Sequence, residues 1–247
     1  MNEVGPLDHK QIMDFLPHRF PFLLTDRIIS IKSDKPMDDE DPKSKIGIVY
    51  NGVTFNDEHA LTQFKKIDFD NRYLLYIGDL RKNKNVISAI KSFEICMRRD
   101  QNLYFYIAGH KSNEYLNLNQ YVKDHGLENR VKFLGYVSEA EKIYLYKKAF
   151  AFIFVSGYEG FGVPIIEAMH YGIPVITSNR SSMKEISGDG AILVSPDNIE
   201  EIANAIQLLE NKDCYEEYVA KGYHIAEKYT WNNSYEQMKQ LLKDVIN

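Results

Sequence analysis

The sequence predicts an α/β protein built on a parallel β-sheet that is covered by helices on both faces. Short apolar runs rich in β-favouring residues recur along most of the chain, and most of them are followed by a segment with helical periodicity. Strands that alternate with helices are typical of parallel sheets covered on both sides, the Rossmann-like class. Because ligands of such sheets bind at the carboxyl ends of the strands, the loops at those ends are where functional residues are expected.

Strands and helices are expected in the following order along the chain. The first candidate strand spans residues 46–53 and ends in an Asn-Gly turn. Later candidate strands lie at residues 73–77, 103–108, 131–134, 150–155, 174–177 and 191–194. Helical spacing is found at residues 86–97, from about residue 163 until Gly172, and at residues 199–209, 215–228 and 235–246.

Composition narrows the class of protein. With 247 residues, of which 44% are hydrophobic, the chain can bury one good core, or a core plus a small appendage. The net charge is −5 and the basic residues are dispersed, which argues against a nucleic-acid partner. Cys96 and Cys214 are far apart without metal-ligand spacing, so reduced thiols are expected. Because no signal peptide and no run of about 20 apolar residues is found, a soluble cytoplasmic protein is expected, with attachment at the inner membrane face left open.

Residues 1–45 differ from the remainder of the chain. Residues 33–45 are charged and contain proline, which indicates an exposed linker that ends where a main domain, residues 46–247, begins. Residues 12–28 resemble the beginning of the 3-hydroxyacyl-acyl-carrier-protein dehydratases, but nothing here matches that family's catalytic His-Phe-Pro-Gly segment. No chemistry is therefore expected from residues 1–45.

Two Asp-x-Asp strings, at residues 39–41 and 68–70, invite a metal-binding interpretation, because paired carboxylates can hold a cation on a diphosphate. The first lies in the linker and the second precedes a predicted strand. Since neither follows a strand, no metal site is expected.

The stretch at residues 149–179 carries the densest functional signal. An apolar strand is followed by a loop, residues 157–162, which we call the glycine loop. Gly160 and Gly162 let the backbone approach a ligand or adopt positive φ, and Pro164 suits the first turn of a helix. Backbone N–H groups and the positive end of the helix dipole meet there, so a phosphate or another anion is the expected ligand.

Two carboxylates flank this anion site. Glu159 lies in the glycine loop and Glu167 about one turn into the helix, so both side chains can be aimed at one cleft. Spacing alone leaves open that Glu167 only complements the helix dipole and that Glu159 is solvated. The string Glu-Gly-Phe-Gly-Val-Pro-Ile-Ile-Glu-Ala-Met, followed by Gly-Ile-Pro-Val-Ile-Thr-Ser-Asn, resembles the signature of the retaining family 4 glycosyltransferases, which carry two Glu residues at this spacing.

A second loop, residues 78–85, which we call the basic loop, follows the strand at residues 73–77. Arg81, Lys82 and Lys84 with neighbouring amide side chains can hold a diphosphate next to a helix N-terminus, although a solvated basic loop has the same composition. The pattern Gly-x-Leu-x-x-x-Lys-Asn resembles the phosphate-binding loop of the same family, which assigns Lys84 as the phosphate lysine. Asp79 and Asn83 stand where many members have Arg, so Arg81 or Lys82 is the expected substitute.

Three further positions lie at the same edge of the predicted sheet. His110 follows a strand, and an ordinary exposed histidine is the favoured interpretation. Tyr136 follows a strand that resembles the one near the nucleotide base in this family, and a core position remains open for it. Ser181 and Ser182 are expected to cap a helix.

This resemblance covers most of the chain and implies the donor-binding, C-terminal half of a GT-B fold. It implies a hexosyltransferase of polysaccharide biosynthesis that retains the anomeric configuration, needs no metal or other cofactor, and transfers a sugar from a nucleoside diphosphate sugar to a glycan, lipid or other acceptor. Glu159 and Lys84 are the expected catalytic residues, and Glu167 is expected to bind the ribose hydroxyls. The residues expected to bind the donor are Gly78, Arg81, Lys82, Lys84, Tyr136, Glu159, Gly160, Phe161, Gly162, Val163 and Glu167.

In relatives, a separate domain binds the acceptor and supplies a catalytic His, and no counterpart of it is recognised in these 247 residues. Three hypotheses follow: an enzyme that completes its site by self-association or with a partner chain, a non-catalytic subunit that binds the nucleotide sugar, and a truncated remnant without activity. The intact glycines and both carboxylates favour the first two. The sugar, base and acceptor are not identified, and GDP-mannose is only a family-level expectation.

Overall fold

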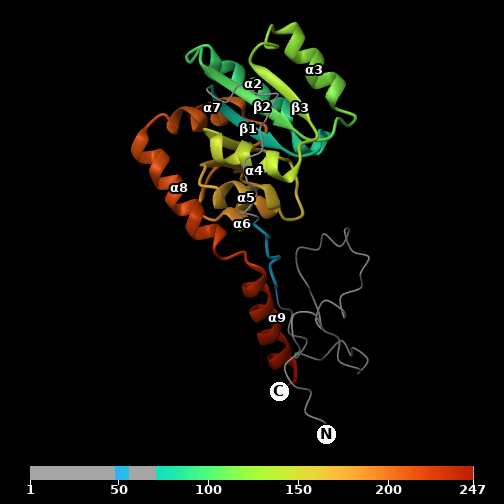
Figure 1. The fold of residues 1–247 in the computed structure, drawn as a ribbon, viewed down its shortest axis with the longest axis vertical. Coiled ribbons are helices and arrows are strands. Elements are labelled where there is room, and N and C mark those ends of the chain that lie inside the picture. The colour runs from blue at the N-terminus through green and yellow to red at the C-terminus, as the bar shows by residue number, and fades with distance from the viewer. Residues whose placement is uncertain (1–47, 56–70, 247) are drawn as a thin grey trace. The chain divides into compact units, whose positions relative to one another are not determined.

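The computed structural model describes residues 48–55 and 71–246 (Figure 1). The described chain divides into two compact units, one with residues 55 and 71–228 and a smaller one with residues 48–54 and 229–246. The domain boundary expected after residue 45, the dehydratase-like segment and both Asp-x-Asp strings lie outside the described residues and stay predictions.

A parallel sheet of six strands forms the centre of the larger unit. Along the sheet the order is β3-β2-β1-β4-β5-β6. The strands are β1 (Arg72–Ile77), β2 (Leu103–Ala108), β3 (Val131–Gly135), β4 (Ala151–Phe154), β5 (Val175–Ser178) and β6 (Ala191–Val194). Because the chain builds outward from β1 in one direction and then returns to β4 on its other side, the strand order reverses between β1 and β4.

Helices cover both faces of this sheet (Figure 1). Tyr73 of β1 donates its hydroxyl hydrogen to the carbonyl of Leu145 (2.8 Å), whereas Phe105 of β2 contacts Phe93, with ring centroids 5.8 Å apart. Tyr73 is in register with Tyr104, so the next residue, Phe105, faces the opposite side. The helices that carry Leu145 and Phe93, α4 and α2, therefore lie on opposite faces. The helical elements of this unit are η1 (Lys82–Lys84), α2 (Val86–Met97), α3 (Tyr115–Asp124), α4 (Glu139–Lys148), α5 (Val163–His170), α6 (Ser181–Ser187), α7 (Ile199–Leu208) and α8 (Lys212–Ala226).

The core lies around the two central strands. Every residue of β4 is buried, as are the four inner residues of β1. Strands buried on both faces read as continuous apolar runs rather than as alternating patterns, which is why the sequence located them. The predicted Rossmann-like α/β class is confirmed.

The strand predicted at residues 46–53 is wrong for the part that the structure describes, because residues 48–53 form no strand. In the smaller unit this segment pairs with the beginning of α9 (Trp231–Ile246). The Val53 N–H donates to the Tyr229 carbonyl (2.8 Å), and the Ser234 hydroxyl donates to the Tyr50 carbonyl (2.6 Å). These bonds satisfy backbone groups that a sheet neighbour would otherwise satisfy.

Two helices begin earlier than their apolar spacing predicts. The α8 helix begins at Lys212 because the Asn211 side chain caps it, accepting from the Cys214 N–H (3.0 Å). The α9 helix begins at Trp231, next to Thr230, whose hydroxyl accepts from the Asn233 N–H (3.2 Å). Among the described residues, no helix combines the length and apolar character that crossing a membrane requires.

Candidate active site

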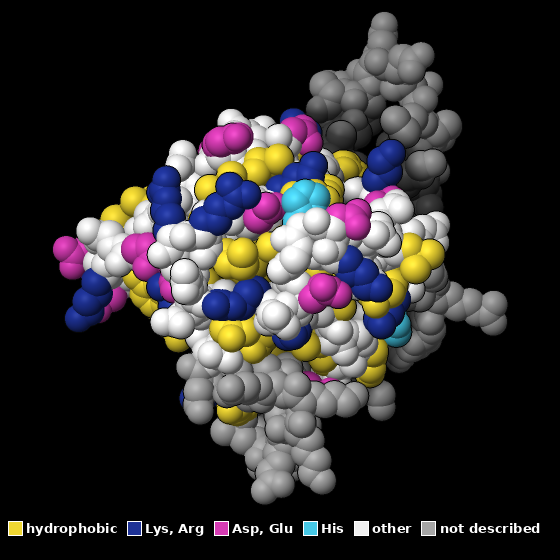
Figure 2. Space-filling model, turned by 90° about the horizontal axis from the view of Figure 1, so that it is seen from above, with side chains coloured by type: hydrophobic (Ala, Val, Ile, Leu, Met, Phe, Trp, Pro, Cys, Tyr) yellow, Lys and Arg dark blue, Asp and Glu magenta, His cyan; other side chains and the backbone are white. Residues whose placement is uncertain are grey.

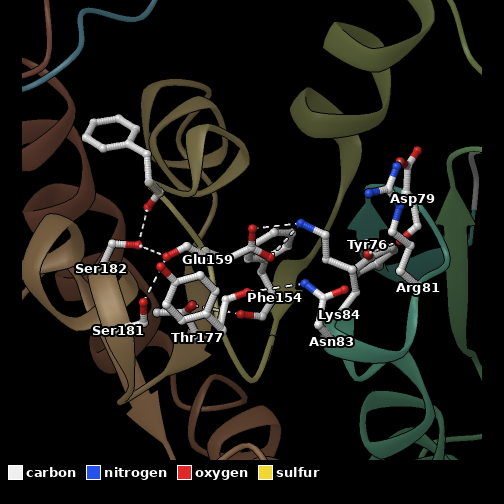
Figure 3. A network of polar contacts seen from close by, with 12 residues as sticks. Tyr76, Asp79, Arg81, Asn83, Lys84, Phe154, Glu159, Thr177, Ser181 and Ser182 are labelled. Atoms are coloured by element: carbon white, nitrogen blue, oxygen red, sulfur yellow. Dashed lines mark hydrogen bonds and ion pairs between the residues drawn. The ribbon is translucent and has the colours of Figure 1, made fainter. Parts of the chain in front are cut away.

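The basic loop after β1 and the glycine loop after β4 meet at the carboxyl edge of the sheet (Figure 3). The Gly157 N–H donates to the Asn83 carbonyl (2.8 Å), and the Asn83 amide donates to the Tyr158 carbonyl (3.4 Å). The two strands that deliver these loops are the neighbours between which the strand order reverses. A crevice at such a switch point is where open α/β sheets bind ligands, so both predicted motifs lie where a ligand is expected.

Lys84 and Glu159, which are 75 residues apart in the chain, form an ion pair across these loops. The Lys84 Nζ lies 2.7 Å from Oε1 and 2.7 Å from Oε2 of Glu159 (Figure 3). Only 20% of the lysine side chain and 11% of the carboxylate side chain are exposed. The residues predicted to be catalytic therefore occupy one place, and each is the other's charge partner.

Asn85 fixes the end of the basic loop. It adopts a left-handed conformation (φ 52°), which ends η1 and lets α2 begin, and Asn tolerates this conformation better than most residues. Its amide donates to the carbonyls of Val155 (3.3 Å) and Pro196 (2.6 Å), while its Oδ1 accepts from the Ser88 hydroxyl (2.9 Å). The adjacent Lys84 is thereby held on a constrained backbone.

Gly162 has a positive φ of 102°, one of the two possibilities that the sequence left open for the loop glycines, and α5 begins directly after it. The side chain of Phe161 is buried, so this predicted donor-binding residue can offer only its backbone, whereas Val163 is exposed. Gly160 lies between Glu159 and Phe161, partly exposed in the same loop.

The expected capping role of Ser181 and Ser182 is wrong. Both hydroxyls donate to the carbonyl of Glu159, at 2.8 Å and 3.0 Å, and that of Ser182 also donates to the Phe161 carbonyl (3.0 Å) (Figure 3). The residue at the cap position of α6, Arg180, makes no side-chain capping bond. The two serines instead tie the glycine loop to α6, a role that sequence spacing does not reveal.

Glu167 in α5 is engaged by two residues of α4. Lys142 Nζ lies 2.7 Å from Glu167 Oε1, and the Tyr146 hydroxyl donates to Oε2 (3.1 Å). Lys142 also reaches the more exposed Glu139 (2.9 Å). Ser138 and Glu141 form a capping box that begins α4, and this Ser-x-x-Glu spacing is the sequence signal that could have found the helix. The helix places Lys142 and Tyr146 four residues apart on one face.

The charges of this cluster shift two pKa values. Burial alone lowers the pKa of Lys142, but the carboxylates of Glu167 and Glu139 outweigh it, so the net shift is upward from the ordinary value. Burial, with the charge and hydrogen bond of Glu167, raises the pKa of Tyr146 well above its ordinary value. Near neutral pH Lys142 is therefore a cation, and Tyr146 keeps the proton that it donates.

The remaining members of the basic loop are exposed. Arg81 pairs with Asp79 (3.0 Å) and Lys82 faces solvent, so neither approaches Glu159 as Lys84 does. Asp79 stands where many family members have Arg, and it partly neutralises Arg81, one of the two residues proposed to replace that Arg. Gly78 was predicted to bind the donor, but packing also explains why glycine stands there. A Cβ at this position would lie 2.8 Å from the hydroxyl oxygen of Tyr76.

Tyr136 is 72% exposed, so it is not a core residue, the alternative that the sequence left open. Its ring lies 5.2 Å from that of His110, centroid to centroid, so the two candidate edge residues are neighbours. Tyr136 also lines a hollow of about 780 Å³ beside β3 with Tyr104 and Phe133. Since neither Lys84 nor Glu159 lines this hollow, we place the site at the switch point instead.

Charge on the visible surface is mixed. On the face shown in Figure 2, Lys and Arg side chains are interspersed with Asp and Glu rather than gathered into one basic stripe. The face shown therefore carries no basic stripe of the kind that follows a nucleic-acid backbone.

The fold agrees with what comparison with known proteins shows. Residues 59–224 match the family model described as glycosyl transferases group 1. The chain belongs to this glycosyltransferase family.

Two relatives are bacterial mannosyltransferases. O-antigen chain mannosyltransferase B of Escherichia coli is 33% identical over 163 residues, which cover 65% of this chain and 43% of the relative. O-antigen chain mannosyltransferase RfbU of Salmonella typhimurium is 34% identical over 177 residues, covering 68% and 48%. The chain thus spans about half the length of these relatives.

Solved structures support the same fold. Sucrose-phosphate synthase from Thermosynechococcus elongatus has a TM-score of 0.61 at 25% identity, covering 73% of this chain and 47% of that one. The C-terminal domain of the group 1 family protein LpcC from Francisella tularensis has a TM-score of 0.58 at 25% identity, covering 64% and 87%. The predicted relation to one half of a GT-B glycosyltransferase is confirmed at the level of fold.

Proposed function

We propose that this chain carries the donor-binding part of a retaining, metal-independent glycosyltransferase of family 4. It would transfer a hexose from a nucleoside diphosphate sugar to a glycan or lipid-linked acceptor. The observation that carries the proposal is the Lys84–Glu159 pair at the switch point, next to the N-terminus of α5.

Lys84 and the α5 N-terminus supply positive charge where a diphosphate would lie. An ammonium group has three donors and the two Glu159 oxygens accept from it, so a diphosphate would share Lys84 with Glu159 or replace Glu159 as its partner. As the sugar leaves, negative charge grows on the diphosphate, and fixed donors in a partly water-excluded site stabilise that growing charge. Glu159, once released, would accept hydrogen bonds from the sugar hydroxyls.

The nucleoside would lie beyond the diphosphate, toward Glu167. That carboxylate suits the ribose hydroxyls, because both hydroxyls are donors and a carboxylate is an acceptor. Tyr136, exposed at the end of β3, offers a ring against which a base can stack.

The names of the relatives support hexosyl transfer over a binding subunit. Both enterobacterial relatives are mannosyltransferases of O-antigen chains, which makes a mannosyl nucleotide the donor to test first and a growing polysaccharide the acceptor class. We further propose a cytoplasmic enzyme, including attachment at the inner membrane face. Its acceptor-binding domain would come from further sequence, from self-association or from a partner chain.

Calorimetry of the chain against GDP-mannose, UDP-glucose and ADP-glucose tests the proposal, with product analysis in parallel. One nucleotide sugar should bind, and Lys84→Ala should weaken it by about 1.5–3 kcal/mol, the worth of a hydrogen bond to a charged group. Lys123→Ala, on the exposed surface of α3, is the matched control and should bind as the parent chain does. No binding of any nucleotide sugar would refute the proposal, and binding without transfer in the presence of an acceptor domain would favour a binding subunit.

A further inference from the structure

The Glu167 carboxylate is held by one internal donor on each oxygen. Lys142 Nζ binds Oε1 at 2.7 Å and the Tyr146 hydroxyl binds Oε2 at 3.1 Å. Both donors come from α4, four residues apart, while Glu167 comes from α5. The carboxylate is therefore fixed from one side and its plane is set by a neighbouring helix.

Counting only the described residues, this arrangement leaves acceptor capacity of the Glu167 carboxylate unused. An ionised carboxylate accepts about four hydrogen bonds, two on each oxygen, and Lys142 and Tyr146 take one on each. The Glu167 side chain is 12% exposed, so the carboxylate is mostly shielded from water but not fully enclosed. Two donors side by side, such as the vicinal 2′ and 3′ hydroxyls of a ribose, match the two oxygens of one carboxylate.

We propose that Lys142 is a positioning residue that holds Glu167 in the orientation needed to read the ribose hydroxyls of the donor. Lys142 thereby sets the preference of the site for ribonucleotides over nucleotides that lack those hydroxyls. The inference rests on the proposed function, because it takes a nucleoside diphosphate sugar as the ligand.

Two physical effects give Lys142 this role. A glutamate side chain that is ordered before binding loses less rotamer freedom when the ribose arrives, and that saved entropy appears as affinity. A carboxylate with little exposed surface also needs a nearby cation to offset its lost hydration, and Lys142, 18% exposed, is at bonding distance. The upward shift in the pKa of Lys142 agrees with a cation held between Glu167 and Glu139.

Glu139 provides the matched control. It binds the same ammonium group at 2.9 Å, but its side chain is 62% exposed and it lies in α4 rather than in α5. Glu139→Gln removes one carboxylate from Lys142 and leaves the bond between Lys142 and Glu167. A role of Lys142 that acts through Glu167 should therefore survive this change.

The experiment compares GDP and UDP with their 2′,3′-dideoxy forms by calorimetry, using the full chain. For the base that binds, the parent chain should prefer the ribonucleotide by about tenfold or more, the value of one hydrogen bond to a charged group. Lys142→Met should weaken binding of the ribonucleotide by about fivefold and change the affinity for the dideoxynucleotide by no more than about twofold. The preference for the ribonucleotide should therefore shrink. Glu139→Gln should keep the preference of the parent chain.

Each other outcome overturns the inference. Equal weakening of both nucleotides by Lys142→Met, or a lower melting temperature with an unchanged preference, would mean that the ion pair is only structural. Equal affinity of the parent chain for both nucleotides would show that Glu167 does not read the ribose, while the diphosphate site would stand. Binding of neither nucleotide would remove the proposed function as well. If Lys142→Met does not fold, Lys142→Arg, which keeps the charge on a wider planar group, should still reduce the preference by about twofold to threefold.

Discussion

Replacing Glu159 by Gln removes one negative charge from the site and keeps the shape of the side chain. That charge holds Lys84, whose Nζ lies 2.7 Å from both carboxylate oxygens. A diphosphate that needs the same ammonium group must compete with Glu159. We therefore expect Glu159→Gln to bind a free nucleoside diphosphate more tightly than the parent chain does.

The magnitude has two parts. Exposed ion pairs are worth about 0.2–1 kcal/mol, and this one, with side chains 20% and 11% exposed, belongs near the upper end of that range. The Glu159 carboxylate would also repel a phosphate that approaches Lys84. Two like unit charges roughly 6 Å apart, at an effective dielectric constant between about 40 and 80, repel each other by about 1 kcal/mol. Together these give a gain of about 2 kcal/mol, or roughly thirtyfold in affinity.

The corresponding nucleotide sugar should gain much less. Glu159 would bind the sugar hydroxyls, and exchanging a charged acceptor for a neutral amide costs about 1 kcal/mol, which offsets about half of the gain. GDP compared with GDP-mannose, or UDP with UDP-glucose, therefore separates the two effects in one variant. Glu128→Gln, an exposed carboxylate before β3, is the control and should change neither affinity.

Calorimetry of both ligands on both variants decides the matter, with thermal melting to check the fold. A weaker affinity of Glu159→Gln for the free diphosphate would refute the reasoning. It would show that Glu159 orders Lys84 for the phosphate rather than competing with the phosphate for it. The same result would leave the position of the site unchanged.

Three other changes test the surrounding structure. A Cβ at Gly109 would overlap the Gly78 carbonyl oxygen, so Gly109→Ala should lower the free energy of unfolding in urea by about 2–4 kcal/mol, whereas Gly126→Ala, with open space around it, should cost only about 1 kcal/mol. Ser182→Ala removes a hydroxyl that donates to two glycine-loop carbonyls, so nucleotide affinity should fall about threefold or more in calorimetry, and unchanged affinity would argue against this tether. Because the pKa of Lys142 is raised in the folded chain, its contribution to stability is fully present below the ordinary value of 10.5 and is lost as pH rises above it. The difference in melting temperature between the parent chain and Lys142→Met should accordingly be constant from about pH 8 to 10 and shrink at higher pH, and a difference that grows there would contradict the sign.

The central strands and the loops that follow them could be predicted because their signal is local. The strand expected at residues 73–77 is β1, within one residue, since a strand buried on both faces is apolar at nearly every position. The positive φ of Gly162 and the helix after it also follow from adjacent residues, because glycine and proline act on their own backbone. The strand expected at residues 46–53 failed because an apolar run fits any partner that covers it, and here the described part pairs with α9.

By itself, the sequence determined the fold class, the two loops and the types of residue in them, since each of these depends on neighbours within about ten positions. Only the tertiary structure decided which charges meet. The sequence assigned Lys84 and Glu159 to one ligand site, but it did not predict that the two side chains would pair with each other across 75 positions of the chain. Likewise Lys142 reaches Glu167 only because α4 and α5 lie on the same face of the sheet. Spacing along the chain determines which face of its own helix or strand a side chain lies on. Its partner depends on which helices and strands pack against each other, and the sequence pattern does not specify that packing.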